Sequence, residues 1–394
     1  MSSKPHIWIV GAGRVSLRIP LLRQLRDSGF QVAAAGPVHS DEFAANGIPF
    51  HGYSLTRRIN PWADRRSIHE LAELFGRHRP DLVHAVNTKP SLFVPRAAQR
   101  AGVPTCVRTI TGMGAIFSSR STVSLLLRPV YRFLQGRAAA QSDFTIFQNP
   151  DDRDYFLSHR LIDADRQSLV HGSGIDVEAF RAGVSEETTL AALRRQLGVE
   201  RRPVVSMVAR LLKPKGIEQF LQAAARVRRK IPNAAFVLIG PAVCGGPTAI
   251  PVDGVASSPD VIYLGRREDI ADLLAISDLF VLPSYLREGL PRVLLEASAL
   301  GLPLITTDMP GCRDVVVDGW NGYLVPPRDD KTLAAAIVEL LSNPAQRAAM
   351  GERSLSHVTE RFHLRLVAEA YAGVYRHVLG EPSARQMVSR RQAA

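Results

Sequence analysis

Two glutamates eight residues apart, Glu288 and Glu296, form the pattern in this sequence with the clearest chemical meaning. Glu288 lies in a turn with Gly289 and Pro291, and a helix is predicted to start near Pro291 and to carry Glu296 about two turns further on. The free N–H groups and the dipole of a helix N-terminus favour a phosphate, and carboxylates accept hydrogen bonds from sugar hydroxyls. This segment is therefore predicted to bind a nucleotide-sugar.

Two cations, Arg210 and Lys215, lie where they could hold a diphosphate. Arg210 ends a predicted strand over residues 204–209, and Lys215 begins the next predicted helix. Arg can bind phosphate through two parallel hydrogen bonds, and Lys supplies a compact charge, so the pair could replace a metal ion. The alternative is a solvated pair of surface charges. Arg266, at the end of another predicted strand, is expected to pack on the nucleotide base.

Residues 287–296 (Arg-Glu-Gly-Leu-Pro-Arg-Val-Leu-Leu-Glu) resemble the Glu-x7-Glu motif of retaining glycosyltransferases of family 4, which have the GT-B fold. Segments 311–314 (Gly-Cys-Arg-Asp) and 318–325 (Asp-Gly-Trp-Asn-Gly-Tyr-Leu-Val) extend this resemblance, which covers most of residues 200–380. It is looser over residues 1–170. There, segment 107–114 (Val-Arg-Thr-Ile-Thr-Gly-Met-Gly) resembles the bacterial subgroup that extends lipid-linked oligosaccharides.

The resemblance implies a role for each residue of the donor site. Arg210 and Lys215 would hold the donor diphosphate and stabilise the leaving group. Glu288 would contact the transferred sugar, and Glu296 would hold the ribose hydroxyls. The backbone of three residues would approach the sugar and phosphates: Gly289, Leu290 and Pro291.

Short β-rich runs alternate with helical patterns, which predicts parallel sheets. The predicted strands are 6–10, 31–35, 82–85, 105–108, 144–147, 204–208, 235–239, 261–264, 279–283, 304–306 and 322–325. With a break at 171–176, we expect an α/β protein with two doubly wound Rossmann-like domains facing an interdomain cleft. An N-terminal acceptor domain would span 1–175 and a nucleotide-sugar domain 176–380, with the last helix packing back on the first domain as an option. Residues 381–394 would be a basic tail.

A glycine loop, Gly11-Ala12-Gly13, follows the first predicted strand. A dinucleotide-binding fingerprint requires a third glycine, where this chain has Ser16, and an acidic residue about 20 positions later, which is missing. An NAD(P)-dependent oxidoreductase therefore remains an alternative that rests on this loop alone. The other interpretations are a plain tight turn and, as the resemblance suggests, a loop at which Gly13 lets the backbone approach the substrate.

The acceptor side is expected among polar residues that follow two other strands. Segment 81–90 resembles a family segment that often reads His-x-His, but only His84 is present, and Val86 occupies the second position. A lone histidine at a strand end also fits a structural hydrogen bond, so Asn87 could line the cleft instead. Thr111 and Gly112 are candidates to close over the acceptor, or they form a flexible loop.

The net charge of +12 suggests an anionic partner. No RNA-binding pattern is visible, and phosphorylated substrates at an anionic membrane surface account for the charge better. Residues 124–137 mix leucines with Arg128, Arg132 and Arg137, so this predicted helix either lies on the membrane or packs inside its domain. Three separated cysteines, Cys106, Cys244 and Cys312, suggest a reducing compartment and form no metal-binding pattern.

We therefore predict a metal-independent glycosyltransferase in the cytoplasm, peripherally bound to the inner face of the plasma membrane. It would transfer a hexose, of the N-acetylhexosamine type, from a UDP-sugar to a sugar on a polyprenyl diphosphate during assembly of O-antigen, capsule or glycoprotein glycan. GDP or ADP donors stay open. The remaining alternatives are a non-catalytic membrane- or polysaccharide-binding protein and a sugar-nucleotide hydrolase or epimerase.

Overall fold

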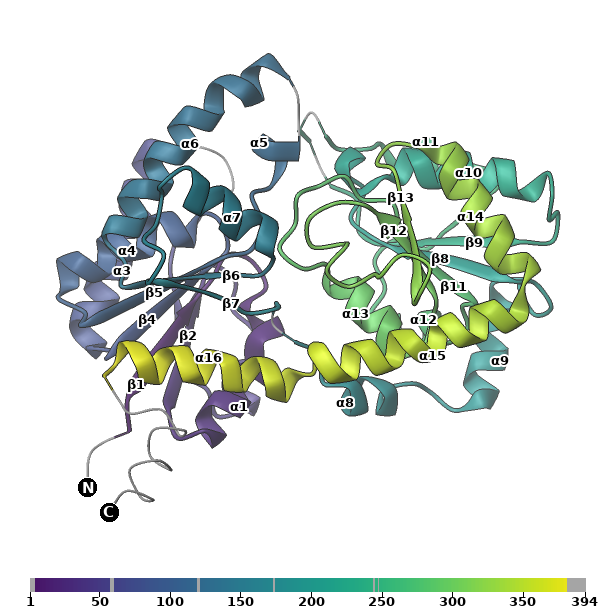
Figure 1. Cartoon of the computed structure of the whole chain (residues 1–394). Coiled ribbons are helices and arrows are strands. Elements are labelled where there is room, and N and C mark those ends of the chain that lie inside the picture. Colours follow the sequence, from purple (N-terminus) through teal and green to yellow (C-terminus); the bar gives the residue numbers. More distant parts are fainter. Residues whose placement is uncertain are drawn as a thin grey trace, which may run out of the picture. The chain divides into compact units, whose positions relative to one another are not determined.

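The computed structural model describes residues 4–56, 60–118, 121–172, 174–243, 245–246 and 248–380. The chain forms two compact units (Figure 1): unit 1 comprises Met1–Gly174 and Leu364–Ala394, and unit 2 comprises Ile175–His363. The first boundary lies one residue before the expected one. Helix α16 (Leu364–Val378) belongs to unit 1, so the second domain is shorter than 176–380, and the last helix packs back on the first domain, which was the expected option. The expected basic tail and Cys244 lie outside the described residues.

Unit 1 contains a seven-stranded parallel sheet in the order β3-β2-β1-β4-β5-β6-β7. The strands are β1 (His6–Val10), β2 (Gln31–Gly36), β3 (Phe50–Gly52), β4 (Leu82–Val86), β5 (Thr105–Ile110), β6 (Phe144–Phe147) and β7 (Gln167–Leu169). The helices are η1 (Val15–Arg18), α1 (Ile19–Asp27), α2 (Glu42–Ala45), α3 (Pro61–His78), α4 (Pro90–Ala101), α5 (Ala115–Ser118), α6 (Thr122–Ala140), α7 (Pro150–Ser158) and α16.

Helices cover both faces of this sheet. α3 and α4 pack on one face, and α1 and α16 share a core on the other (Figure 1). α16 returns to unit 1 because it buries Leu364, Val367, Tyr371 and Tyr375, which recur every three or four residues and so form one apolar face. The C-terminal helix thus supplies part of the core of unit 1.

Unit 2 contains a six-stranded parallel sheet in the order β10-β9-β8-β11-β12-β13. The strands are β8 (Val204–Val208), β9 (Ala235–Ile239), β10 (Ile262–Tyr263), β11 (Leu279–Leu282), β12 (Leu304–Thr307) and β13 (Gly322–Val325). The helices are α8 (Val177–Ala182), α9 (Glu187–Gln196), η2 (Lys213–Lys215), α10 (Ile217–Arg228), α11 (Val252–Ala256), α12 (Ile270–Ala275), α13 (Arg292–Ala299), α14 (Asp330–Ser342) and α15 (Pro344–Arg361).

Each sheet has a point at which the strand order reverses. In unit 1 the chain proceeds outward from β1 to β3 and then crosses to β4, on the other side of β1. In unit 2 it proceeds from β8 to β10 and then crosses to β11, on the other side of β8. Loops that follow such neighbouring strands diverge to opposite faces, which leaves a crevice where ligands bind in sheets of this type. The expected α/β fold with two doubly wound sheets is confirmed.

The sequence analysis missed two strands, β3 and β7. Each has three residues and lies at an edge of the unit 1 sheet, and their side chains are half-buried or exposed. A three-residue edge strand shows neither the alternation nor the continuous apolar run that predicts a strand from sequence. Only pairing with β2 and β6 identifies them.

A substitution at Gly216 tests how closely the loop after β8 packs against the loop after β11. Its φ is +79°, and a Cβ atom there would lie 2.1 Å from the carbonyl oxygen of Pro283. We expect Gly216→Ala to lower the free energy of unfolding by about 3 kcal/mol or more, because backbone must move. Gly198→Ala is the control: φ is +66° but nothing lies within 4 Å, so the cost should stay at about 1 kcal/mol. If urea unfolding gave the same loss of unfolding free energy for Gly216→Ala and Gly198→Ala, this account would be wrong.

Candidate functional site

The central feature of unit 2 is an ion pair between Lys215 and Glu288. Nζ of Lys215 lies 2.6 Å from Oε2 of Glu288, and the two side chains are only 11% and 19% exposed. Lys215 follows β8 and Glu288 follows β11, so the pair lies at the point where the strand order reverses. The structure thus brings together two predicted site residues that are 73 positions apart in the sequence.

The backbone around this pair is held in place by close contacts. The N–H of Tyr285 donates to the carbonyl of Pro214 at 2.8 Å, which joins the loop after β11 to the loop after β8. On the other side, Gly311 has a φ of +84°, and a Cβ there would lie 2.5 Å from the carbonyl oxygen of Gly289. Only glycine allows this approach. The family-like segment 311–314 therefore supports the backbone that follows Glu288.

Cys312 is buried beside this ion pair. Burial raises the pKa of its thiol to about 12, and the nearby carboxylate of Glu288 adds to the rise. A thiol with such a pKa is not a nucleophile at neutral pH. From the sequence, Cys312 counted as one of three separated cysteines and as part of the family-like segment 311–314, and its burial beside the ion pair appears only in the fold.

Glu296 lies inside helix α13, which begins at Arg292 after Pro291. Its side chain is 15% exposed and accepts a 2.8 Å hydrogen bond from Nε of Arg292, one turn earlier. Burial raises the pKa of Glu296, although Arg292 opposes that rise. Glu296 is therefore paired with an arginine of its own helix and is mostly buried. A mostly buried carboxylate with one partner can still accept hydroxyl hydrogen bonds.

The other predicted donor residues differ in burial. Gly289 and Pro291 are buried and Leu290 is half-buried in the turn before α13. Arg210 is exposed just beyond β8. Arg266 is exposed and donates to Glu268 at 2.7 and 3.1 Å. The structure brings neither arginine to the Lys215–Glu288 pair, so their roles remain predictions.

In unit 1 the structure brings together two predicted loops, again at the reversal of strand order. The N–H of Ala12, in the loop after β1, donates to Oδ1 of Asn87, just after β4, at 3.1 Å. Gly13 and Asn87 both have positive φ, +78° and +77°. Thr111 and Gly112 follow the neighbouring strand β5 and are half-buried and buried. These residues share one end of the unit 1 sheet.

His84 does not fit the acceptor role that the sequence analysis considered. It is fully buried within β4, Nδ1 lies 2.6 Å from the Tyr375 hydroxyl, and Nε2 lies 2.6 Å from Oγ1 of Thr109. Burial lowers its pKa to about 3, so the ring stays neutral. His84 therefore makes structural hydrogen bonds, which was the alternative to an acceptor role. It joins α16 to the sheet, and because it is fully buried an acceptor cannot reach it.

Comparison with known proteins now adds to this geometry. The family model described as Glycosyl transferases group 1 matches residues 191–357, and the one described as Glycosyl transferase 4-like domain matches residues 11–173. The two matches span both units, and the first includes Arg210, Lys215, Glu288 and Glu296. The chain is a group 1 glycosyltransferase. The family resemblance inferred from residues 287–296 is confirmed, and the oxidoreductase alternative falls.

This glycosyltransferase has relatives along nearly its whole length. It is 25% identical over 374 residues to the N,N'-diacetylbacillosaminyl-diphospho-undecaprenol alpha-1,3-N-acetylgalactosaminyltransferase of Campylobacter jejuni, covering 94% of this chain and 97% of that protein. It is 29% identical over 291 residues to the UDP-Gal:alpha-D-GlcNAc-diphosphoundecaprenol alpha-1,3-galactosyltransferase of Escherichia coli, covering 73% of each. Its fold matches the crystal structure of Anabaena Alr3699/HepE in complex with UDP-glucose (TM-score 0.76, 19% identity, 94% and 99% covered).

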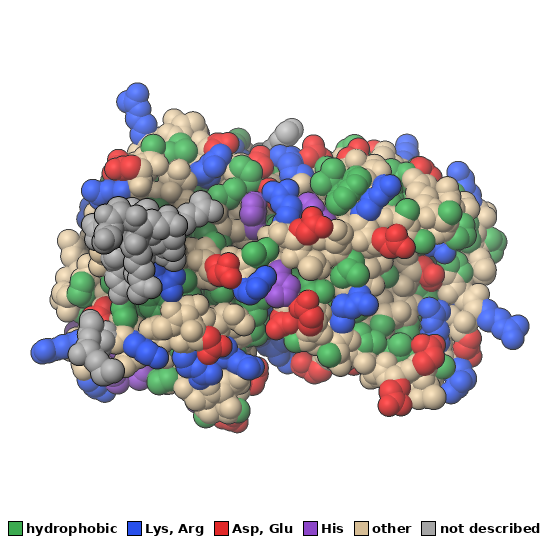
Figure 2. Space-filling view, turned by 60° about the horizontal axis from the view of Figure 1, so that its bottom comes forward, with side chains coloured by type: hydrophobic (Ala, Val, Ile, Leu, Met, Phe, Trp, Pro, Cys, Tyr) green, Lys and Arg blue, Asp and Glu red, His purple; other side chains and the backbone are tan. Residues whose placement is uncertain are grey.

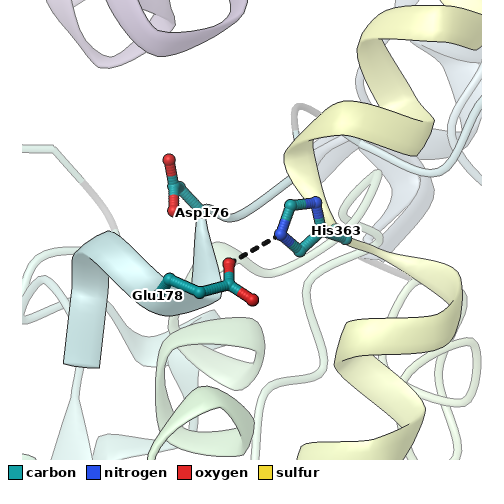
Figure 3. Close-up of side chains that lie close together, drawn as sticks. All are labelled: Asp176, Glu178 and His363. Atoms are coloured by element: carbon teal, nitrogen blue, oxygen red, sulfur yellow. Dashed lines mark hydrogen bonds and ion pairs between the residues drawn. The ribbon is translucent and has the colours of Figure 1, made fainter. Parts of the chain in front are cut away.

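A possible metal-binding group lies elsewhere in unit 2 of the glycosyltransferase. Among the residues that the structure describes, Asp176, Glu178 and His363 place ligand atoms within 4.8 Å of one another (Figure 3). These atoms already have protein partners: Asp176 caps α8 through the N–H of Ala179, and Glu178 bonds Nε2 of His363 at 2.8 Å. The group joins the two chain segments that enter and leave unit 2. It contains none of the predicted donor residues.

Glu296 gives the glycosyltransferase a pH-dependent stability. Its pKa is raised in the folded state, so between the ordinary value and the raised one the folded protein holds a proton that the unfolded chain releases. Stability should therefore fall as pH rises through this window. We expect Glu296→Gln to flatten that part of the urea-unfolding profile and to raise stability at pH 7.5 by about 1 kcal/mol. Glu352→Gln, at an exposed site on α15, should leave the profile unchanged. A steeper slope in Glu296→Gln would refute this account.

Proposed function

We propose that this protein transfers a hexose, of the N-acetylhexosamine type, from a UDP-sugar to a sugar on a polyprenyl diphosphate, with retention of configuration and without a metal ion. The Lys215–Glu288 ion pair at the reversal of the unit 2 sheet is the observation on which the proposal depends. A lysine beside a carboxylate offers one group for a diphosphate and one for sugar hydroxyls.

The surroundings of this pair suit a nucleoside diphosphate sugar. Helix α13 starts four residues after Glu288, and the N–H groups at its start favour a phosphate oxygen. Glu296, about one turn into the helix, would accept ribose hydroxyls. In this proposal Lys215 and Arg210 neutralise the diphosphate, which leaves no requirement for a divalent cation.

Retention fits an attack on the same face of the sugar that the diphosphate leaves. The bond between the anomeric carbon and the β-phosphate oxygen breaks, and the acceptor hydroxyl oxygen bonds to that carbon. The departing phosphate oxygen takes the hydroxyl proton. Lys215 and Arg210 would stabilise the developing charge on the leaving group through preorganised electrostatics, so the mechanism assigns no general base.

The acceptor class follows from the relatives. The names of the Campylobacter jejuni and Escherichia coli relatives both specify undecaprenol diphosphate-linked sugars, and the first specifies transfer of N-acetylgalactosamine. We extend the lipid-linked acceptor and the N-acetylhexosamine donor to this chain as proposals. The route would be assembly of a bacterial surface polysaccharide or glycan at the inner face of the plasma membrane.

Helix α6 offers a surface for that membrane. Tyr131, Gln135 and Ala138 are buried and fix its inner side. On its outer side, Val123, Leu126 and Phe133 are 66%, 71% and 63% exposed, and three further apolar side chains are also exposed: Leu125, Val130 and Leu134. Arg128, Arg132 and Arg137 lie among them. An exposed apolar stripe with interspersed arginines suits an anionic bilayer surface.

Charged side chains are spread over the face of the molecule that Figure 2 shows. Figure 2 shows Lys and Arg side chains interspersed with Asp and Glu over the face in view, so the net charge of +12 is not gathered in one patch there. In the described parts of the chain, no helix is both long and apolar enough to cross a membrane. We propose peripheral attachment through the exposed apolar side chains of α6.

Transfer to undecaprenyl-diphosphate-linked N-acetylglucosamine tests the function. We expect the purified protein to transfer sugar from one of UDP-N-acetylgalactosamine, UDP-N-acetylglucosamine, UDP-galactose or UDP-glucose, with the same rate in EDTA. Glu288→Gln should lower turnover about 100-fold, because the carboxylate would contact the transferred sugar. Glu352→Gln, an exposed glutamate on α15, is the matched control and should retain full turnover.

Three results would count against this proposal. Unchanged transfer by Glu288→Gln would remove Glu288 from the donor site. Activity that EDTA abolishes and Mg²⁺ restores would refute metal independence. Release of sugar at the same rate without acceptor would indicate a hydrolase instead, and use of GDP- or ADP-sugars would change only the donor.

Membrane attachment is tested by co-sedimentation with phosphatidylglycerol-containing vesicles at low salt. The triple variant Val123→Ser, Leu126→Ser and Phe133→Ser should bind at least tenfold more weakly, because each side chain would lose contact with the bilayer interior. Its thermal midpoint should stay near that of the parent, since all three side chains are exposed. Val317→Ser, at a 44% exposed site of unit 2, is the control. Unchanged binding by the triple variant would exclude α6 as the contact.

A further inference from the structure

Ser284 is a fully buried serine where the Lys215 and Glu288 loops meet. It follows Pro283 at the end of β11, four residues before Glu288. Its Oγ lies 3.0 Å from Oε1 of Glu288, 3.2 Å from the carbonyl oxygen of Pro214, and 3.3 Å from the N–H nitrogen of Leu286. One side chain therefore contacts both loops of the ion pair.

The single hydroxyl proton of Ser284 has two acceptors within reach, and the carboxylate is the better one. The carbonyl of Pro214 already accepts the N–H of Tyr285 at 2.8 Å. Glu288 is nearer and charged, and hydrogen bonds to a charged acceptor are roughly twice as strong as neutral ones. Meanwhile the N–H of Leu286 donates to Oγ, which orients the hydroxyl. Ser284 thus donates to Glu288.

The two oxygens of Glu288 then have different partners. Oε1 accepts from Ser284, and Oε2 accepts from Lys215 at 2.6 Å. A lysine alone would let the carboxylate rotate, because a compact ammonium group imposes no orientation. The serine removes this freedom before a substrate arrives, and such preorganisation is what a group aimed at a reacting sugar requires.

Ser284 is itself fixed by its neighbours. Oγ1 of the buried Thr307, at the end of β12, donates to the carbonyl oxygen of Ser284. Three adjacent strand ends, those of β8, β11 and β12, therefore determine where the hydroxyl lies. These contacts hold the Ser284 hydroxyl at a defined position beside Glu288.

We propose that Ser284 is a positioning residue that orients the Glu288 carboxylate toward the transferred sugar. The inference rests on the proposed function, in which Glu288 contacts that sugar. It implies a selective defect: without the hydroxyl, the protein should still bind UDP, which lacks the sugar, but should use the UDP-sugar poorly.

The experiment compares Ser284→Ala with Ser354→Ala. Ser354 is also fully buried in unit 2, and its hydroxyl donates to the carbonyl of the distant Asn321 at 3.0 Å. We expect Ser284→Ala to lower kcat about tenfold while the Kd for UDP, from calorimetry, changes less than twofold. Ser354→Ala should alter neither. In a Glu288→Ala background, Ser284→Ala should cause no further loss of kcat.

A second measurement needs no substrate. Contacting residues have non-additive effects on stability, so Ser284→Ala should lower the thermal midpoint less in the Glu288→Ala background than in the parent. Ser354→Ala should lower it equally in both. The inference would be overturned if Ser284→Ala lowered the thermal midpoint by the same amount with and without Glu288→Ala. It would also be overturned if Ser284→Ala lowered UDP affinity as much as kcat. If the parent neither binds UDP nor transfers sugar, the proposed function fails, and the midpoint cycle alone still decides whether Ser284 positions Glu288.

Discussion

The buried ion pair between Lys215 and Glu288 is the constraint around which unit 2 is arranged. Two charges that are mostly removed from water are tolerable only when they face each other and their remaining hydrogen bonds are satisfied. This requires the loops after β8 and β11 to approach within a few ångströms. Gly216 permits that approach, and Gly311, after β12, permits the close packing of its loop on Gly289, where a Cβ atom would collide with backbone. The donor loops are therefore shaped by charge compensation as well as by the ligand they are proposed to hold.

Unit 1 uses a buried polar cluster differently. His84 is neutral and joins β4, Thr109 of β5 and Tyr375 of α16 through its two ring nitrogens. The hydrogen bonds satisfy a group that would otherwise be costly to bury. They also fix α16 on one face of the sheet. The buried polar residues of the two units therefore differ in charge and place. In unit 2 they form an ion pair between loops, and in unit 1 they form neutral hydrogen bonds between the sheet and α16.

Sequence patterns predicted the two parallel sheets and the loops that carry the donor residues. The parallel sheets follow from apolar runs such as 204–208 and 235–239, and Lys215 and Glu288 were both expected in the donor site, although their direct ion pair was not. The burial of His84 could not be predicted, because its partner Tyr375 is 291 residues away and no periodicity links them. Ser284 was invisible for a similar reason: a serine after a strand has no distinctive pattern until its hydroxyl is seen against Glu288.

The return of α16 to unit 1 also has a consequence for biosynthesis. Unit 2 is one continuous stretch, Ile175–His363, whereas unit 1 needs residues from both ends of the chain. Domains usually complete folding in the order in which they leave the ribosome. Here the core that α1 and the sheet of unit 1 form stays incomplete until Tyr371 and Tyr375 are synthesised, after all of unit 2. The N-terminal unit therefore completes its core last, and the apolar surface that α16 covers stays exposed until that helix is made.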